Sequence, residues 1–300
     1  MGCLSLVRQE NEYRAIHHLH EQKGYPIAIL CEILGINRSS YYKWKNRVKS
    51  TNECRNEALI PIIREAYGER NGILGYRQMT IKLNREHGAR FNHKRIYRLM
   101  RLLGLKSVCR RKRYSYVKST PQVTAENILN RDFTANRPNQ KWLTDVTELK
   151  FGNGQKAYLS AIMDLGDRSI PSYLLGRSNN NALAFATFDQ AIAANPTANP
   201  IFHSDRGFQY TNKLFKAKLD KAGMTQSMSR VGKCLDNAPM EGFWGILKSE
   251  MFYLRSFISF DDLESAIHDY MTFYNSNRYQ KRLNSMSPLE FRSYLDSLAS

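Results

Sequence analysis

The stretch from Asn237 to Glu250 constrains the fold most, because it combines a buried helix stripe with a charged face. Asp236 or Asn237 can cap the start of such a helix, and a proline is tolerated in its first turn. Glu241 and Lys248 are seven residues apart and share a face outside the stripe, where they form either a solvated pair or part of a site. The buried stripe recurs every three or four residues, at Met240, Phe243, Trp244, Leu247, Met251 and Leu254.

Two predicted strands upstream each carry an acidic residue. Residues 142–149 are rich in β-forming side chains and hold Asp145 near their middle. Residues 201–205 form a short strand-like run that ends at Asp205. Each acid also has an ordinary alternative: Asp145 could be an edge-strand charge, Asp205 a turn residue, and Glu241 a surface residue. The order and spacing of the three together are more specific than any one of them.

The spacing of these acids resembles that of a known enzyme family. Thirty-five residues separate Asp205 from Glu241, and Lys248 follows Glu241 by seven. Two of these acids lie in longer motifs, His203-Ser204-Asp205-Arg206-Gly207-x-Gln209-Tyr210 and Asp236-Asn237-Ala238-x-x-Glu241. They resemble the DDE transposases of bacterial insertion sequences, of the second-reading-frame type, whose catalytic core is similar to retroviral integrase. The resemblance covers nearly the whole chain and is most specific over residues 140–295.

The predicted fold class is α/β, with all-α helix-turn-helix modules before it. The resemblance implies a ribonuclease-H-like mixed sheet flanked by helices, and the pattern from residue 140 onward has the matching order. We expect strands at 142–149, 157–164, 170–175, 201–205 and 224–228, helices at 181–194 and 212–222, and then the Glu241 helix.

The three acids predict a site for divalent metal ions. Carboxylates that meet at one point repel one another unless a cation lies between them. Hard oxygen ligands suit Mg²⁺ or Mn²⁺, and two such ions ~4 Å apart can promote an in-line phosphoryl displacement. The hypothesis is that, with DNA bound, Asp145 bridges both ions, Asp205 holds one and Glu241 the other.

Other polar residues near the predicted site are expected to have separate roles. Glu148 competes with Asp145, but strand alternation puts the two on opposite faces, and the resemblance selects Asp145. Lys248 is expected to contact DNA phosphate or a terminal base, and His203 to be a packed neighbour and not a base. Gln280 stands where many relatives carry His. Structural roles are expected for Asp164, Asp167 and Asp236.

The charge of the chain is uneven. Residues 1–135 contain 26 Lys and Arg against 11 Asp and Glu, whereas residues 136–300 contain 19 against 16. A solvated basic face is the usual explanation of such a bias, but an excess this large favours a polyanionic partner. We therefore expect the first part of the chain to bind double-stranded DNA.

Two helical modules are predicted in that basic part. Residues 26–44 give an apolar helix, a glycine-containing turn and a second helix, a pattern typical of helix-turn-helix domains. The runs Tyr76-Arg77-Gln78 and His93-Lys94-Arg95 resemble the helix-turn-helix region that precedes the core in this transposase group, and Asn92 is a suitable N-cap. The candidate DNA contacts are Arg38, Ser39, Ser40, Lys43, Arg77, Lys94 and Arg95.

A basic segment joins the helical modules to the core. Arg111, Lys112 and Arg113 open a stretch without helical period, which either lies along DNA phosphates or is a solvated linker. The predicted segments are helix-turn-helix at 1–50, a second helical DNA-binding domain at 51–110, a basic linker at 111–137, the catalytic core at 138–257 and a helical tail at 258–300.

The resemblance implies a transposase that cuts and rejoins DNA at the ends of a mobile element, with a freed 3′ hydroxyl attacking a second DNA site. It further implies a homo-oligomer on DNA and an upstream-frame partner or fusion. A nuclease of the same fold without joining activity and a DNA-binding regulator are the alternatives. No apolar run approaches the ~20 residues that span a bilayer, so we expect a cytoplasmic, nucleoid-associated protein without a membrane partner.

Overall fold

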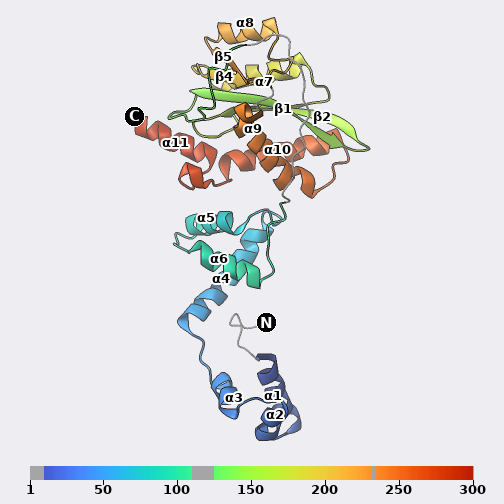
Figure 1. The fold of residues 1–300 in the computed structure, drawn as a ribbon, viewed down its shortest axis with the longest axis vertical. Coiled ribbons are helices and arrows are strands. Elements are labelled where there is room, and N and C mark those ends of the chain that lie inside the picture. Colours follow the sequence, from blue (N-terminus) through green and yellow to red (C-terminus); the bar gives the residue numbers. More distant parts are fainter. Residues whose placement is uncertain (1–9, 110–124, 232–233, 300) are drawn as a thin grey trace. The chain divides into compact units, whose positions relative to one another are not determined.

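The computed structural model describes residues 10–109, 125–231 and 234–299 (Figure 1). The chain divides into two compact units, Met1–Ser107 and Val108–Ser300. The predicted linker residues Arg111, Lys112 and Arg113 lie outside the described residues. No helix in the described part of the chain combines the length and apolarity that crossing a membrane requires.

The first three helices of the first unit form a small apolar cluster. They are α1 (Glu10–Lys23), α2 (Ile27–Ile33) and α3 (Arg38–Lys45). Gly35 takes a positive φ of 62° in the turn between α2 and α3, and the side chain of Asn37 accepts the Ser39 backbone N–H to cap α3. The cluster contains Tyr13, Ile16, Leu30, Cys31, Ile36 and Tyr41. Helices α2 and α3, with the turn between them, match the two helices that the sequence predicts over residues 26–44.

The next three helices are α4 (Thr51–Gly68), α5 (Tyr76–Glu86) and α6 (His93–Leu102). The side chain of Asn92 accepts the Lys94 backbone N–H, so the predicted cap of α6 is confirmed. The sequence predicts helix α4 only over residues 60–67, and that start is wrong. A capping box between Ser50 and Glu53 begins the helix at Thr51, and Pro61 lies inside it.

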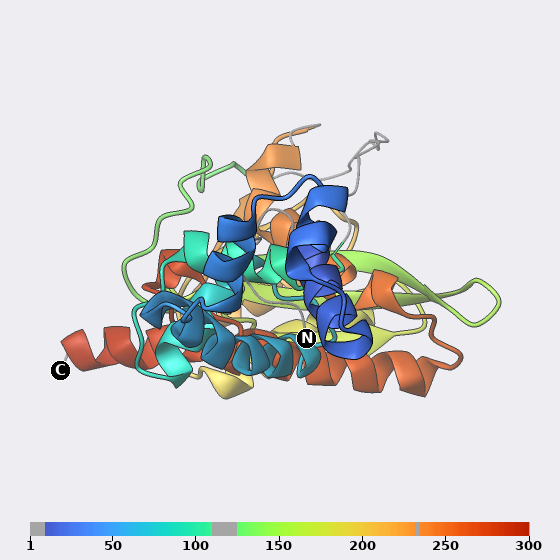
Figure 2. The ribbon, with the colours of Figure 1, turned by 90° about the horizontal axis from the view of Figure 1, so that it is seen from below.

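The second unit is built on a five-stranded mixed sheet with the order β3-β2-β1-β4-β5. Strands β1, β2 and β3 are antiparallel neighbours, whereas β4 and β5 run parallel to β1. The turn between β1 and β2 projects from the sheet in both views (Figures 1 and 2). The strands are β1 (Lys141–Phe151), β2 (Gln155–Asp164), β3 (Ser172–Gly176), β4 (Ile201–Ser204) and β5 (Thr225–Met228). The predicted fold class is confirmed.

Helices cover both faces of this sheet (Figure 1). On one side are α7 (Asn181–Ala194) and α8 (Lys213–Lys221), and on the other are α9 (Ala238–Glu250), α10 (Phe260–Ser276) and α11 (Pro288–Ala299). Short 3-10 helices lie at Cys234–Asn237, Phe252–Leu254 and Lys281–Leu283. Because side chains alternate along β1, Trp142 packs with α7 and α8, whereas Asp145 faces α9.

Buried carboxylates paired with arginine fix the segments around the sheet. Arg292 of α11 bonds to Asp164 at 2.9 Å and also to Asp167, beyond the end of β2. Asp236 accepts from Arg230 at 2.9 Å and from Arg131 at 2.6 Å. The hydrogen bonds from Arg230 hold the pKa of Asp236 well below its usual range. These contacts confirm the structural roles predicted for the three acids.

The end of α9 is held by a buried ion pair. Arg278, which follows α10, bonds to both carboxylate oxygens of Glu250 at 2.7 and 2.8 Å, and Tyr270 donates a further bond at 2.9 Å. The side chains of Arg278 and Glu250 are only 11% and 8% exposed. The pair therefore ties the last turn of α9 to the helical tail.

Replacing Arg278 by alanine should lower the free energy of unfolding by ~3–5 kcal/mol, because Glu250 would keep a buried charge without its partner. Urea-induced unfolding followed by tryptophan fluorescence measures the change. The control is Lys216→Ala, which removes an exposed pair with Asp220 and should cost less than ~0.5 kcal/mol. Equal losses in the two variants would contradict the role of the Arg278 pair.

Candidate active site

Helix α9 contacts strand β1 through two side-chain hydrogen bonds. The indole Nε1 of Trp244 donates to Oδ2 of Asp145 at 3.0 Å, and Nζ of Lys248 donates to Oγ1 of Thr147 at 2.6 Å. Asp145 and Thr147 lie on one face of the strand, and Trp244 and Lys248 are one helical turn apart. Helix α9 therefore runs along the strand that carries Asp145 and brings Glu241 to the same side of the sheet.

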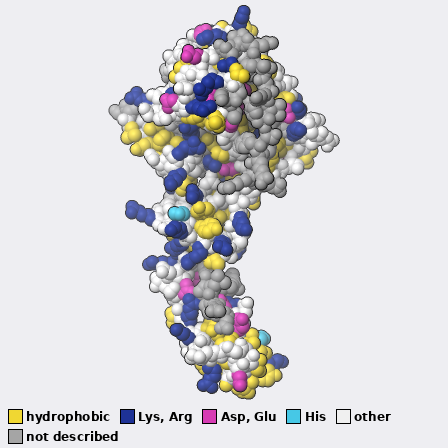
Figure 3. Space-filling view, viewed as in Figure 1, with side chains coloured by type: hydrophobic (Ala, Val, Ile, Leu, Met, Phe, Trp, Pro, Cys, Tyr) yellow, Lys and Arg dark blue, Asp and Glu magenta, His cyan; other side chains and the backbone are white. Residues whose placement is uncertain are grey.

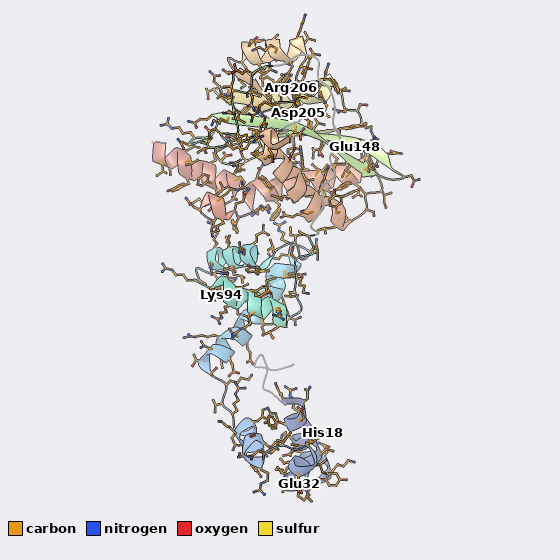
Figure 4. All side chains as sticks on the ribbon, viewed as in Figure 1. His18, Glu32, Lys94, Glu148, Asp205 and Arg206 are labelled. Carbon is orange, nitrogen blue, oxygen red and sulfur yellow. The ribbon has the colours of Figure 1, made fainter. Side chains whose placement is uncertain are left out.

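Asp205 lies directly after β4, the strand next to β1. The two strands are parallel, and Leu143 pairs with His203, so the register brings Asp145, which is inside β1, level with Asp205. The backbone N–H of Gly207 donates to Oδ1 of Asp205 at 2.9 Å. A Cβ at Gly207 would lie 2.9 Å from that oxygen and 2.6 Å from Oε1 of Gln209, so a larger residue would displace these side chains. Figure 4 labels Asp205 and Arg206 at this strand end.

The three acids influence one another electrostatically. Burial, and then repulsion by the Asp205 and Glu241 carboxylates, raises the pKa of Asp145 to about 7. Burial also raises the pKa of Asp205 and that of Glu241. This concentration of hard oxygen donors and negative charge fits a divalent cation. Within the described ranges, however, no three acidic, His or Cys side chains are already arranged around a common metal position.

The structure places Glu148 away from this site. Glu148 is exposed and pairs with Lys156 of β2 at 3.0 Å. Figure 4 shows Glu148 on β1, nearer the β1–β2 turn than Asp205 is. Glu148 is thus engaged in an exposed cross-strand pair, and the choice of Asp145 as a ligand stays a prediction.

His203 is a packed residue. Its ring nitrogens contact the hydroxyl oxygens of Ser227 at 2.9 Å and Ser229 at 3.1 Å, and the residue is fully buried. Burial lowers the pKa of His203 to about 4, so the ring is neutral near pH 7. As predicted, it is a neighbour of the site and has no free nitrogen to act as a base.

Three residues that join α9 to β1 were not predicted to do so. The sequence places Trp244 only in the buried stripe, does not single out Thr147 of β1, and suggests Asn237 as a cap and as part of the resemblance motif. Asn237 occupies the N-cap position of α9 but makes no side-chain cap bond, and its amide donates instead to the Thr144 carbonyl at 3.1 Å. These contacts join residues about 100 positions apart, and the only signal in the sequence is that Trp244 follows Glu241 by one turn.

The DNA-contact candidates on α3 lie mainly on its outer surface. Arg38, Ser39 and Lys43 are exposed, as predicted, whereas Ser40 is half-buried. The Ser39 hydroxyl donates to Oδ1 of Asn37 at 2.8 Å, so it also takes part in the cap.

The candidates on α5 and α6 differ from one another. Arg77 donates to the Tyr76 hydroxyl at 3.0 Å, and Lys94 is exposed in the first turn of α6 (Figure 4). Arg95 is half-buried and donates to Asn56 at 2.8 Å, so part of its donor capacity serves packing against α4. Lys and Arg side chains are frequent on the visible face of this helical segment (Figure 3).

Three family matches cover both units of the chain. Residues 54–113 match an HTH-like domain. Residues 135–234 and residues 241–294 each match an integrase core domain. The second core match begins at Glu241, after a gap from residue 235 to 240. The HTH-like match covers most of α4 and all of α5 and α6.

Individual relatives align over most of the chain. It is 40% identical over 270 residues to the "Putative transposase InsK for insertion sequence element IS150" of Escherichia coli, covering 90% of this chain and 94% of the relative. It is 43% identical over 215 residues to an "Uncharacterized transposase-like protein" of Haemophilus influenzae, covering 72% and 98%. Among solved structures, the HTLV-2 integrase catalytic core domain in complex with magnesium matches with 19% identity and a TM-score of 0.41, over 52% of this chain and 97% of that one.

Replacing Asp145 by asparagine should stabilise the metal-free protein at pH 8. The folded state keeps a proton on Asp145 up to about pH 7, whereas the unfolded chain releases it near pH 4, so stability falls as pH rises through this window. The gain from Asp145→Asn should reach as much as ~4 kcal/mol at pH 8 and vanish near pH 4. Urea unfolding in EDTA measures it at both values.

The control for this effect is Glu148→Gln, which removes an exposed carboxylate from the same strand and should change stability by less than ~0.5 kcal/mol at either pH. An Asp145→Asn protein that is less stable than the parent at pH 8 would show that no surplus charge destabilises the site.

Proposed function

Because the chain belongs to the insertion-sequence transposases with an integrase core domain, we propose that it cuts DNA at the ends of a mobile element and joins them to a second DNA site. The observation that carries this proposal is the pairing of two parallel strands, which brings Asp145 within β1 level with Asp205 just after β4, with the helix of Glu241 bonded to β1. Phosphoryl transfer needs little covalent chemistry from the protein and much positioning and charge.

The proposed ligands of the metal are the three acids. Asp145, Asp205 and Glu241 would hold Mg²⁺ or Mn²⁺, two ions with DNA bound, with Asp145 shared between them. When bound, the ions would activate the attacking oxygen and stabilise the leaving one. The protein's own part is to orient the carboxylates through the N–H groups of Trp244 and Gly207. His203 is not assigned a proton transfer, because its pKa is lowered and both of its nitrogens are engaged.

DNA affinity is assigned mainly to the helical modules. The exposed residues Arg38, Ser39 and Lys43 on α3, with Ser40, would meet one DNA segment, and Arg77, Lys94 and Arg95 would meet another. The basic linker with Arg111, Lys112 and Arg113 would follow the phosphates between them. We infer that the working form is a homo-oligomer on paired element ends at the cytoplasmic nucleoid, alone or with an upstream-frame partner or fusion.

The proposed five segments follow from this assignment of DNA binding to the helical modules and of catalysis to the core. Residues 1–50 and 51–110 would bind DNA, 111–137 would link, 138–257 would catalyse, and 258–300 would buttress α9. The last role is supported by the Arg278–Glu250 pair.

Asp145→Asn, Asp205→Asn and Glu241→Gln should each abolish cleavage and joining while DNA binding is largely retained, because each removes one negative ligand from the proposed ion cluster. Labelled element ends are incubated with target DNA and Mg²⁺, and cleaved and joined products are separated on a gel. Glu148→Gln is the matched control and should stay active.

Retained joining by any of the three variants would refute the assignment. Cleavage without joined product in the parent protein would favour a nuclease. DNA binding without metal-dependent nicking would favour a regulator.

Lys248→Ala should weaken the binding of element ends several-fold and reduce the salt dependence of binding by about one phosphate contact. The lysine lies on the face of α9 that meets β1, where its ammonium donates to Thr147. A fluorescence anisotropy titration at several salt concentrations measures both effects, with Lys216→Ala on α8 as the control. Unchanged affinity of Lys248→Ala would remove this role.

A further inference from the structure

Asp145 is oriented by two neutral N–H groups. Its Oδ1 accepts the backbone N–H of Val146 at 2.8 Å, and its Oδ2 accepts the indole N–H of Trp244 at 3.0 Å. The first bond comes from the neighbouring residue on the same strand. The second comes from α9, 99 positions away in sequence, and is the one that relates the carboxylate to the opposing helix.

Trp244 links the position of α9 to the orientation of the Asp145 carboxylate. The residue is 6% exposed, packs against Phe243 with ring centroids 5.1 Å apart, and follows Glu241 by one helical turn. A rigid ring fixed in the core cannot adjust its N–H without moving the helix. The helix that carries Glu241 thereby also determines how Asp145 is turned.

We propose that Trp244 is a positioning residue for Asp145, so that α9 sets two of the three acidic ligands, Glu241 directly and Asp145 through the indole N–H. This inference rests on the proposed metal-dependent function. Each carboxylate oxygen has lone pairs for more than one partner, so the indole bond orients Asp145 and still leaves it able to bind a cation.

A second tryptophan in the same unit provides an internal comparison. The indole of Trp142 donates to Oδ1 of Asn139 at 3.2 Å and also to a carboxylate, Oδ2 of Asp164, at 3.3 Å. Asp164, however, is held as well by Arg292 and by the backbone N–H groups of Asn139 and Gly166. Loss of the Trp142 bond therefore leaves Asp164 anchored, whereas Asp145 would keep only the bond from Val146 of those that orient it here.

The test is the affinity of the full-length protein, bound to element-end DNA, for Mn²⁺. Free Mn²⁺ is followed by its electron paramagnetic resonance signal during titration. Trp244→Phe keeps an aromatic ring and removes the N–H, and should raise the dissociation constant 10- to 100-fold, as loss of groups that orient metal ligands typically does. Trp142→Phe should lower thermal stability and leave the Mn²⁺ dissociation constant unchanged.

An unchanged Mn²⁺ dissociation constant in Trp244→Phe, or an equal rise in Trp142→Phe, would overturn the inference. If Trp244→Phe does not fold, β-(3-benzothienyl)alanine at position 244 keeps the two-ring shape with sulfur in place of the N–H, and the same rise is expected. Asp145→Asn separates the two hypotheses. If it binds Mn²⁺ as the parent does, the proposed ligand role of Asp145 fails, whereas weakened binding in Asp145→Asn but not in Trp244→Phe overturns only the role of Trp244.

Discussion

The contact between α9 and β1 is the interaction on which the candidate site depends. Two residues of a strand span ~6.6 Å, and four residues of a helix rise ~6 Å. Asp145 and Thr147 on β1 can therefore meet Trp244 and Lys248 on α9 at matching intervals, and both hydrogen bonds are formed. Because the two intervals match, α9 runs alongside β1, although about 100 residues of sequence separate the contacting residues. Without it, Glu241 would have no fixed relation to the two aspartates.

Ionic contacts fix α9 at both ends. Before its first turn, Asp236 is bound by Arg230 and Arg131, and in its last turn Glu250 is bound by Arg278. Buried ion pairs often add little net stability, because desolvation offsets much of their attraction. Their contribution here is geometric: a helix with two fixed ends cannot slide along β1, so the spacing between its side chains and the strand is kept.

The sequence predicted most of the core, because its signals there are local. Strand alternation around Asp145 and the helix at 181–194 depend on neighbouring residues, and the observed strands and the helices α7 and α8 differ from those expected by at most two residues. The helix stripe expected to reach Leu254 ends earlier, because α9 stops at Glu250 and Leu254 lies in a short 3-10 helix. The prediction was wrong for the start of α4, because the capping box at Ser50 begins the helix nine residues before Ile60. The Trp244 bond to Asp145 could not be predicted, because a buried aromatic stripe gives no sign of which partner its N–H will meet.

The distribution of arginines explains why the candidate site is the place where negative charge accumulates. Ion pairs join Arg292 to Asp164, Arg230 to Asp236 and Arg278 to Glu250, so these acids are neutralised within the fold. The hydrogen bonds described for Asp145 and Asp205 come instead from neutral N–H groups, those of Val146, Trp244 and Gly207. Neutral donors orient a carboxylate without cancelling its charge. In a chain with 45 Lys and Arg against 27 Asp and Glu, burial and this local surplus of negative charge raise the pKa of Asp145, and under the proposed function a divalent cation would balance the charge while leaving the carboxylates where α9 and β4 hold them.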